Sequence, residues 1–564
     1  MYRRVAPSLL ALALVTGCTG PTRTTSNDGR PPGGTLVIAE QADIGHLISV
    51  VSESAADGDI DSNISFPIVD SDFDCSLKKL PGIAKSWEWS DDGKVLSMTL
   101  RDDITFSDGV PVTAKDIKFT YDLIADPKVA SPRLSYIERM VPGERPKVID
   151  DTHIEWHFTE AYDRDTQMAH ASAVSVLPEH ILGKADRATL RGNPYDKDPL
   201  ATGPFKLASY EPNTRIVLEP NDKFTGPDEY KPHLDRVIFS IIPEYSTRLI
   251  ELQNGDVDLM QGITVSDADM LREKHPQIRL VRRGWRSMDY VAWNETKPMF
   301  QDKRVRKALA MAVDIDDMIS KVLTSKTGES YAKRAIGTVT PALCGVYNDQ
   351  IKPLSYNQEQ AKKLLADAGW VDRDGDGFLD KDGKKFEFTL STNTGNRRRA
   401  DTAILIQAYL EKIGVRVDIE KQESNTFFDN LRKKDYEAAL SGWSAGLFVD
   451  PSTIWHSDVT CGPDAAPDCK ARKYEFNFVG YSNPEADELM QEGLRTPEPE
   501  KSAPIWKHLQ QVIYDDQPYL FLWWMDEIVG VSDRFEDTQI DVLSPIDHLY
   551  KWRVPADKIK YQTH

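Results

Sequence analysis

The sequence predicts an α/β protein with more than one lobe, and three observations support this class. The chain has 564 residues, which is the length of two to four domains. Hydrophobic residues make up 40 % of it and charged residues of both signs another 28 %, a composition that builds packed cores rather than disordered chain. Helical and strand-like patterns alternate between about residues 300 and 520, as in a layered α/β lobe.

Hydrophobic spacing and turn residues place the individual elements in order. An apolar strand is expected at residues 36–39, and Asp-Asp-Gly at 91–93 joins residues 87–89 to residues 95–100 as a hairpin. Strand-like runs lie on either side of the last predicted helix, at residues 386–390 and 415–419. Apolar residues recur at helical spacing over residues 114–124, 247–253, 304–313, 358–368 and 400–413. The front third of the chain is richer in hairpins and loops.

The charge balance limits the partners of the protein. The formal net charge is −20 and the sequence pI is about 5.1. An acidic surface repels phosphate backbones and anionic membranes, so no nucleic-acid partner is expected. Neutral or cationic small ligands remain open.

The N-terminus predicts an export signal followed by a lipid anchor. Arg3 and Arg4 precede an apolar stretch at residues 8–15 that is too short to span a bilayer. The stretch ends in Val-Thr-Gly-Cys, which resembles the bacterial lipobox. Residues 1–17 are therefore expected to be removed, Cys18 to carry lipid, and residues 18–33, rich in Thr, Ser, Gly and Pro, to form a flexible tether. An ordinary signal peptide with a chance cysteine is the alternative.

Four cysteines follow Cys18 in the chain. Outside the cytoplasm an even number favours disulfides over metal ligands or reactive thiols. Cys461 and Cys469 bracket a loop rich in Pro, Gly and Asp and form the expected pair. Cys75 and Cys344 would pair by elimination, and that pairing stays open.

Six segments, in order along the chain, resemble one known family. They are Leu-Pro-Gly-Ile-Ala-Lys-Ser-Trp-Glu at residues 80–88 with Asp-Gly at 92–93, residues 100–109 with 111–116, and residues 201–207, 254–258, 302–309 and 480–485. Together they resemble family 5 of the extracytoplasmic solute-binding proteins of ABC importers, whose best-known members bind oligopeptides and dipeptides.

The resemblance implies a fold and a function. The fold is a two-lobed, periplasmic-binding-protein-like clamp (type II, cluster C) with an extra subdomain inserted in the first lobe and the solute enclosed between the lobes. The implied boundaries are residues 34–65, 201–289 and 517–564 for lobe I, 66–200 for the inserted subdomain and 290–516 for lobe II. The implied function is a monomeric, membrane-anchored receptor that delivers a peptide or similar nitrogenous solute to the permease of an ABC importer, on the periplasmic side or on a Gram-positive cell surface. It performs no bond chemistry and requires no cofactor. Oligosaccharides, opines and metal chelates are alternative solutes.

The resemblance also implies a solute-binding loop at Trp443, Ser444, Ala445 and Gly446. In peptide-binding relatives this loop carries an aspartate that pairs with the peptide α-amino group, and Gly446 stands at that position here. Asp450 is a candidate replacement, or alternatively a helix cap. The other candidate ligands, each with surface solvation as its alternative, are Arg397 at a helix start, Glu40 and Asp43 after the first strand, and Asn294.

Two further motifs support alternative functions. Gly-Trp-Ser-Ala-Gly at residues 442–446 matches the nucleophile elbow of secreted serine hydrolases, with Ser444 as the nucleophile. The elbow requires a helix directly after the serine, whereas the sequence places the next helix start at Asp450 and Pro451. Asp372, Asp374, Asp376 and Asp380 occupy positions 1, 3, 5 and 9 of a calcium-type loop. One interpretation is a structural Ca²⁺, and a surface adhesion protein held together by calcium would be the corresponding function. The other interpretation is a simple Asp/Gly turn, because position 12 is Gly383 and not the glutamate that completes a calcium loop.

Overall fold

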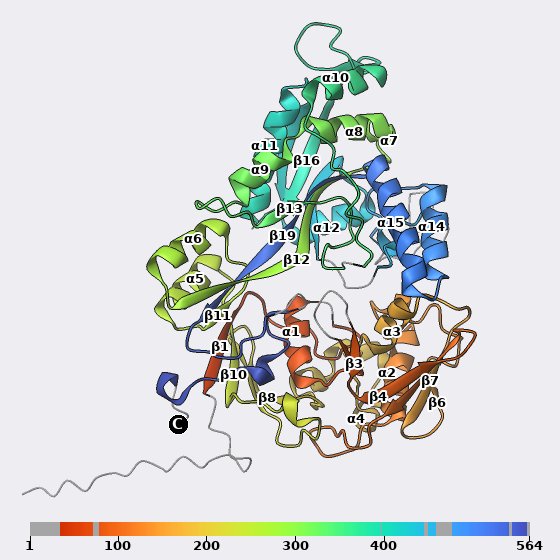
Figure 1. Cartoon of the computed structure of the whole chain (residues 1–564), viewed down its shortest axis with the longest axis vertical. Coiled ribbons are helices and arrows are strands. Elements are labelled where there is room, and N and C mark those ends of the chain that lie inside the picture. The colour runs from red at the N-terminus through yellow and green to blue at the C-terminus, as the bar shows by residue number, and fades with distance from the viewer. Residues whose placement is uncertain are drawn as a thin grey trace, which may run out of the picture.

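Two lobes joined by a pair of long strands make up the molecule (Figure 1). The computed structural model describes residues 34–52, 54–71, 78–343, 345–394, 396–444, 449–457, 476–540 and 544–560. In Figure 1 the upper lobe is lobe II and the lower left part is lobe I, with the inserted subdomain at the lower right.

The strands of the described residues are β1 (Thr35–Glu40), β2 (Val69–Ser71), β3 (Lys79–Pro81), β4 (Ala84–Trp89), β5 (Val95–Leu100), β6 (Lys147–Val148), β7 (His153–His157), β8 (Phe205–Glu211), β9 (Arg215–Pro220), β10 (Arg236–Ile241), β11 (Leu259–Met260), β12 (Ile278–Trp293), β13 (Ala332–Arg334), β14 (Asp380–Lys381), β15 (Lys384–Lys385), β16 (Glu387–Asn393), β17 (Arg416–Gln422), β18 (Ala438–Ser444) and β19 (Tyr519–Ser532).

The α-helices of the same residues are α1 (Ala55–Ile64), α2 (Ala114–Ala125), α3 (Arg164–Ser172), α4 (Glu179–Leu182), α5 (Tyr245–Asn254), α6 (Val265–Lys274), α7 (Pro298–Gln301), α8 (Lys303–Ala312), α9 (Ile315–Val322), α10 (Gln358–Asp367), α11 (Arg397–Glu411), α12 (Ser424–Lys433), α13 (Ser452–Trp455), α14 (Pro484–Leu494) and α15 (Pro499–Asp516). None of the described helices combines the length and the apolar surface needed to cross a bilayer.

One mixed sheet runs through both lobes. Its order is β17-β16-β18-β12-β19-β11-β1-β10-β9-β8, and β13 pairs with β19. In lobe I, β1 is parallel to β10 and β11, and in lobe II, β16 is parallel to β17 and β18. The crossing strands β12 and β19 are antiparallel to each other. β12 also pairs antiparallel with β18 of lobe II, and β19 pairs antiparallel with β11 of lobe I. The carboxyl ends of the parallel strands in one lobe therefore point toward those of the other lobe.

Local capping fixes where the helices begin and end. The helix expected at residues 400–413 begins earlier, at Arg397, because the side chain of Asn396 caps it by accepting the backbone N–H of Arg399 at 3.1 Å. α5 ends at Gly255, whose φ of 77° places it in the left-handed conformation that glycine adopts without strain. The expected hairpin near residue 90 is observed as β4 and β5.

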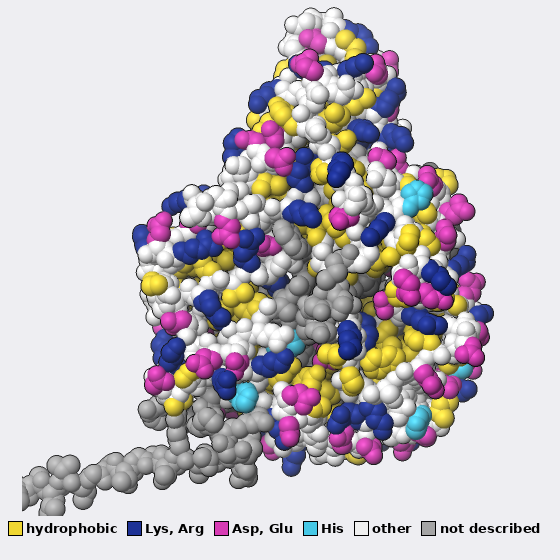
Figure 2. Space-filling view, viewed as in Figure 1, with side chains coloured by type: hydrophobic (Ala, Val, Ile, Leu, Met, Phe, Trp, Pro, Cys, Tyr) yellow, Lys and Arg dark blue, Asp and Glu magenta, His cyan; other side chains and the backbone are white. Residues whose placement is uncertain are grey.

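Each part of the molecule has its own core. The inserted subdomain packs side chains of β5, β7 and α2, among them Met98, Tyr121 and Trp156. In lobe II, α8 and α11 cover one face of the sheet and α14 and α15 contribute to a cluster on the other. Lobe I is closed by the last residues of the chain, including Trp552 and Val554, which pack with β1 and β10. Figure 2 shows acidic and basic side chains interspersed over the face in view.

Candidate functional site

The two facing strand edges form the candidate site. On lobe I, Glu40 ends β1 and Gln261 follows β11. On lobe II, Trp443 and Ser444 end β18, and the N-terminus of α11 follows β16. In open α/β sheets, ligands bind at the carboxyl ends of strands where the chain direction reverses. The topology therefore places two such edges opposite each other.

A buried aspartate clamps two arginines at the lobe II edge. Asp289 of β12 has 0 % relative exposure. Its carboxylate accepts hydrogen bonds from Nε of Arg398 at 2.8 Å and from Nε of Arg399 at 3.1 Å. Arg399 also donates to Oδ1 of Asn393 at the end of β16. The cluster ties the first turn of α11 to the middle of the sheet.

This cluster carries one more positive than negative charge. Burial alone would raise the pKa of Asp289, but the charges of Arg398 and Arg399 outweigh it and lower the pKa below its ordinary value, so the carboxylate is ionised. The Arg398 side chain keeps 31 % of its surface exposed. Arg398 is therefore the member of the cluster with the most exposed side chain.

Gly442 allows this close packing. A Cβ at this position would lie 2.4 Å from Nη2 of Arg399 and 2.6 Å from the carbonyl oxygen of Met288. Any larger residue would push the arginine away from Asp289.

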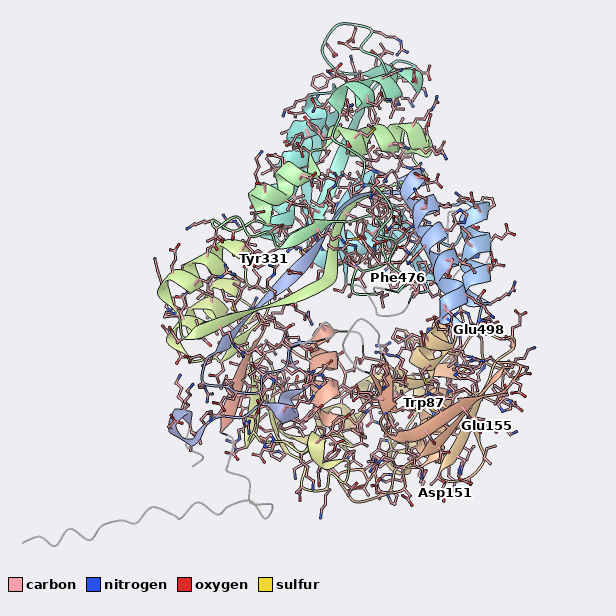
Figure 3. The ribbon with its side chains drawn as sticks, viewed as in Figure 1. Trp87, Asp151, Glu155, Tyr331, Phe476 and Glu498 are labelled. Atoms are coloured by element: carbon pink, nitrogen blue, oxygen red, sulfur yellow. The ribbon has the colours of Figure 1, made fainter. Side chains whose placement is uncertain are left out.

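Aromatic side chains pack on the face of β12 and β18 opposite to the arginine cluster. Trp443 stacks on Phe478 with ring centres 5.6 Å apart and contacts Phe476 edge-on at 5.4 Å. Behind it, Tyr290 stacks on Tyr519 at 4.0 Å. Phe476 is 36 % exposed, and Figure 3 shows it on the lower side of lobe II, facing the inserted subdomain. An exposed aromatic in contact with the end of β18 suits an apolar part of a ligand.

The lobe I edge is acidic. Burial raises the pKa of Glu40. Burial and the nearby charges of Glu40 and Asp547 raise the pKa of Asp59 in α1 to about 8. The amide of Gln261 donates to Asp59 at 3.4 Å. With a pKa of about 8, the Asp59 carboxyl is mostly protonated at neutral pH, on the edge that faces the cationic edge of lobe II.

Three predicted ligands have other roles in the structure. The Arg397 side chain is 93 % exposed and its nearest acidic partner is Asp401 at 3.8 Å, so Arg398 and Arg399 occupy the edge instead. Asn294 is fully buried, and both hydrogens of its amide are used on the carbonyls of Lys434 and Tyr436. Its donors are therefore not available to a solute.

Asp43 is committed to lobe I. Its carboxylate accepts the Tyr210 hydroxyl at 2.9 Å and the Asn213 backbone N–H at 2.7 Å. These contacts hold the turn between β8 and β9, so Asp43 stabilises the backbone of lobe I.

The serine of the Gly-x-Ser-x-Gly motif lies at a strand end, and the residues directly after it, 445–448, lie outside the described part of the chain. Ser444 is the exposed last residue of β18, while the next described helix begins only at Ser452. An elbow requires the helix to follow the serine directly. Ala445 and Gly446 lie outside the described residues. Asp450 accepts the backbone N–H and hydroxyl of Ser452 and also pairs with Arg139 of the inserted subdomain. Asp450 was predicted as the N-cap of the next helix. In the structure the N-cap of α13 is the following residue, Pro451.

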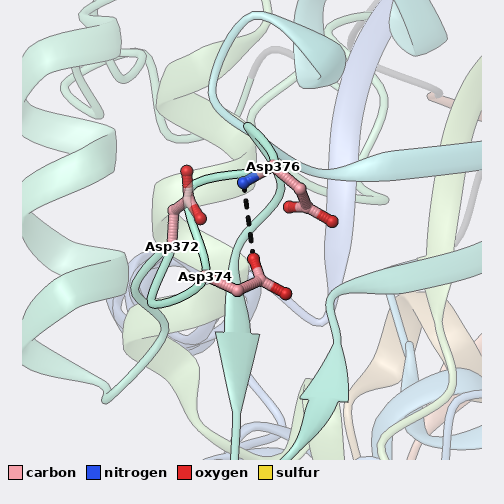
Figure 4. A group of neighbouring side chains, drawn as sticks. All are labelled: Asp372, Asp374 and Asp376. Carbon is pink, nitrogen blue, oxygen red and sulfur yellow. Dashed lines mark hydrogen bonds between the residues drawn. The ribbon is translucent and has the colours of Figure 1, made fainter.

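In the aspartate-rich loop, the ammonium group of Lys385 pairs with two of the aspartates. Asp372, Asp374 and Asp376 lie close together (Figure 4). Nζ of Lys385 approaches Asp374 at 2.6 Å and Asp376 at 2.8 Å. Asp380 pairs instead with Arg373 at 2.8 Å. Calcium binding at this loop stays a prediction, and it requires the ion to displace Lys385.

The predicted lipid and disulfide sites, Cys18, Cys75, Cys344, Cys461 and Cys469, lie outside the described residues.

Sequence reasoning missed Asp289 and Phe476, and among the three arginines at residues 397–399 it chose Arg397 rather than Arg398. A signal for Asp289 was present: it is the one charged residue in the run Met-Asp-Tyr-Val-Ala-Trp at residues 288–293. A charge in a buried strand needs an ionic partner. The identity of that partner depends on the register of the sheet, which the sequence does not show.

Comparisons with known proteins agree with this architecture. Residues 79–465 match the family model of bacterial extracellular solute-binding proteins, family 5. The chain is 30 % identical over 555 residues to the oligopeptide-binding protein AppA of Bacillus subtilis, covering 96 % of this chain and 97 % of that protein. The structure of that protein with a nonapeptide has a TM-score of 0.77 at 28 % identity and covers 93 % of this chain and 100 % of its own. NikZ of Campylobacter jejuni in complex with Ni(L-His) has a TM-score of 0.78 at 23 % identity, with the same coverage.

Proposed function

Because the chain belongs to the bacterial extracellular solute-binding proteins of family 5, we propose that it captures peptides between its two lobes and delivers them to the permease of an ABC importer. The family consists of binding proteins, and the chain is a binding protein rather than an enzyme. The predicted two-lobed α/β clamp is confirmed by the structural likeness to members of the family.

The observation that carries the peptide proposal is the cationic cluster at the lobe II edge. Asp289 neutralises only one of the two arginines, and Arg398 remains partly exposed. A guanidinium binds a carboxylate through paired, charge-assisted hydrogen bonds. The C-terminal carboxylate of a peptide fits this requirement, and the aromatic group around Trp443 and Phe476 suits apolar side chains of the same ligand.

The AppA relative, whose solved complex contains a nonapeptide, supports a peptide as the solute. NikZ, which was solved with Ni(L-His), gives the alternative of a metal chelate. A histidine chelate also carries a carboxylate, so the charge of the site alone does not separate the two classes, and a direct binding test is needed.

The test is a titration of the chain from residue 34 onward with penta-alanine bearing a free C-terminal carboxylate, with its C-terminal amide, and with Ni(L-His). We expect the free acid to bind about tenfold or more tightly than the amide, because a hydrogen bond to a charged group contributes about 1.5–3 kcal/mol. Arg398→Gln should remove this preference. The matched control is Arg101→Gln, an arginine of the inserted subdomain that pairs with its neighbour Asp103.

Equal affinity for acid and amide would refute the role of Arg398. Binding of Ni(L-His) without any binding of penta-alanine would replace the peptide by a chelate as the solute.

We also propose that Cys18 carries the lipid that holds the protein at the outer face of a membrane. The fold supports this arrangement: the first described residue, Gly34, is fixed to lobe I through hydrogen bonds with Asp235. The residues between Cys18 and Gly34 would reach about 55 Å when fully extended. Cys18→Ser should release the protein from the membrane fraction, and an unchanged distribution would contradict the anchor.

A further inference from the structure

A second contact between the lobes lies away from the crossing strands. There the turn between α14 and α15 meets the start of α3 in the inserted subdomain (Figure 1). The backbone N–H of Asp163 donates to the carbonyl of Leu494 at 2.7 Å, and that of Arg164 donates to Pro497 at 3.3 Å. Figure 3 shows Glu498 of this turn directly above the inserted subdomain.

The contact combines packing of Tyr162 against the lobe II cluster with several polar pairs. The Ser502 hydroxyl donates to the carboxylate of Asp163 at 3.2 Å, and Arg495 pairs with Glu160 at 2.9 Å. Polar pairs of this kind form and separate more readily than apolar contacts, because their groups are also hydrogen-bonded in water when apart.

The most buried ion pair of the contact joins Arg139 to Asp450. Nη2 of Arg139 lies 2.9 Å from Oδ2 of Asp450, and their side chains are 22 % and 10 % exposed. Burial would raise the pKa of Asp450, but Arg139 outweighs it and lowers the pKa. His170 also faces the pair, and burial together with the charge of Arg139 lowers its pKa, so it is neutral. Arg139 is therefore the cation that balances Asp450.

Packed side chains connect this ion pair to the candidate site. Asp450 accepts the backbone N–H of Ser452 at the start of α13. Trp455 of the same helix is fully buried and contacts Tyr519 of β19 at 4.6 Å. Tyr519 stacks on Tyr290, and Tyr290 stacks on Trp443 at 5.9 Å. A continuous series of packed rings thus joins α13 to the tryptophan at the end of β18.

We propose that the inserted subdomain acts as a latch that holds the lobes closed, and that Arg139 is a positioning residue which sets how slowly the closed protein releases its solute. Closure is an equilibrium between two lobe arrangements, and contacts made in only one of them shift it. The statement about solute release rests on the proposed function, whereas the statement about closure does not.

Hydrogen exchange tests the latch without any solute. The backbone N–H groups of Asp163 and Arg164 are bonded across the interface, so they exchange only when it opens. In the full exported chain, Arg139→Gln should raise their exchange rates about tenfold or more, while the exchange of the amides of β5 and β7 stays unchanged. Arg101→Gln, whose ion pair lies within the inserted subdomain, should change none of these.

Unchanged exchange at Asp163 and Arg164 in Arg139→Gln would overturn the latch. If that variant unfolds, Asp450→Asn keeps the size of the side chain and removes the same ion pair. Faster exchange in Asp450→Asn then supports the proposal, and wild-type exchange overturns it.

Release of penta-alanine tests the second statement. We expect Arg139→Gln to raise its dissociation rate about tenfold with little change in the association rate. Equal dissociation rates would overturn the role of Arg139 in retention. If penta-alanine binds neither protein, the peptide proposal fails, and hydrogen exchange still decides whether the latch exists.

Discussion

Replacing Asp289 by asparagine tests the buried cluster at the lobe II edge. Asparagine has nearly the same shape but no charge, so Arg398 and Arg399 would lose their common counter-ion. Breaking a buried ion pair by removing one partner costs about 3–5 kcal/mol, and Asp289 is fully buried with two hydrogen bonds of 2.8 and 3.1 Å to the arginines. We expect Asp289→Asn to lower the thermal midpoint of lobe II by about 10 °C.

The loss should depend on pH in a defined direction. The arginines lower the pKa of Asp289 in the folded protein, so its contribution to stability is present above the unfolded pKa of about 3.9 and is lost as the pH falls through the lower folded value. The difference between wild type and Asp289→Asn should be largest at neutral pH and shrink below about pH 4.

Circular dichroism melts of both proteins at pH 7 and at about pH 2.5 measure this difference. The control is Asp103→Asn, which removes an exposed partner of Arg101 and should cost about 0–1 kcal/mol. A midpoint for Asp289→Asn within error of wild type at pH 7 would refute the claim that the buried pairs hold the start of α11 in place.

Three further changes have defined outcomes. Gly442→Ala should destabilise the protein by about 1–3 kcal/mol, because its Cβ would collide with Arg399. The control, Gly58→Ala in α1, has open space around it and should not destabilise the protein. Thermal melts of the two variants measure the difference. Lys385→Met should bind Ca²⁺ more tightly than wild type, since Nζ no longer competes for the aspartates; equal calorimetric affinities contradict this. The lowered pKa of the buried His170 makes wild type lose stability as the pH falls below about 6.5. His170→Phe should therefore lose less stability than wild type on going from pH 7 to pH 5. Parallel profiles of stability against pH for the two proteins would contradict this.

Local patterns predicted the elements that depend on local contacts. The helices expected at residues 114–124 and 358–368 are α2 and α10, and the strands expected at 386–390 and 415–419 are β16 and β17. The crossing strand β12 was not predicted as a strand. It carries arginines at positions 279, 282, 283 and 286, so its first half has no apolar alternation. Its strand conformation comes from pairing with β19, more than two hundred residues later in the chain.

The site was predicted less well than the fold, for the same reason. The sequence placed an arginine at the start of α11 but selected Arg397, because helical spacing alone does not say which of three adjacent arginines faces the sheet. The choice is made by Asp289, a residue of another strand. Asp43 was selected as a polar residue after a strand, and Asn294 was a further candidate. The structure uses both to fix the backbone.

The strand β19 has a consequence for how the chain folds. It pairs with strands of both lobes and supplies side chains to four separate clusters of buried residues, among them Trp523, Trp524, Val529 and Ile528. Because β19 begins at Tyr519, neither lobe completes its sheet until almost all of the chain is available. Folding therefore has a high contact order and is slow. A single cut between the lobes does not yield two independent domains, and loss of the last strand disrupts both lobes together.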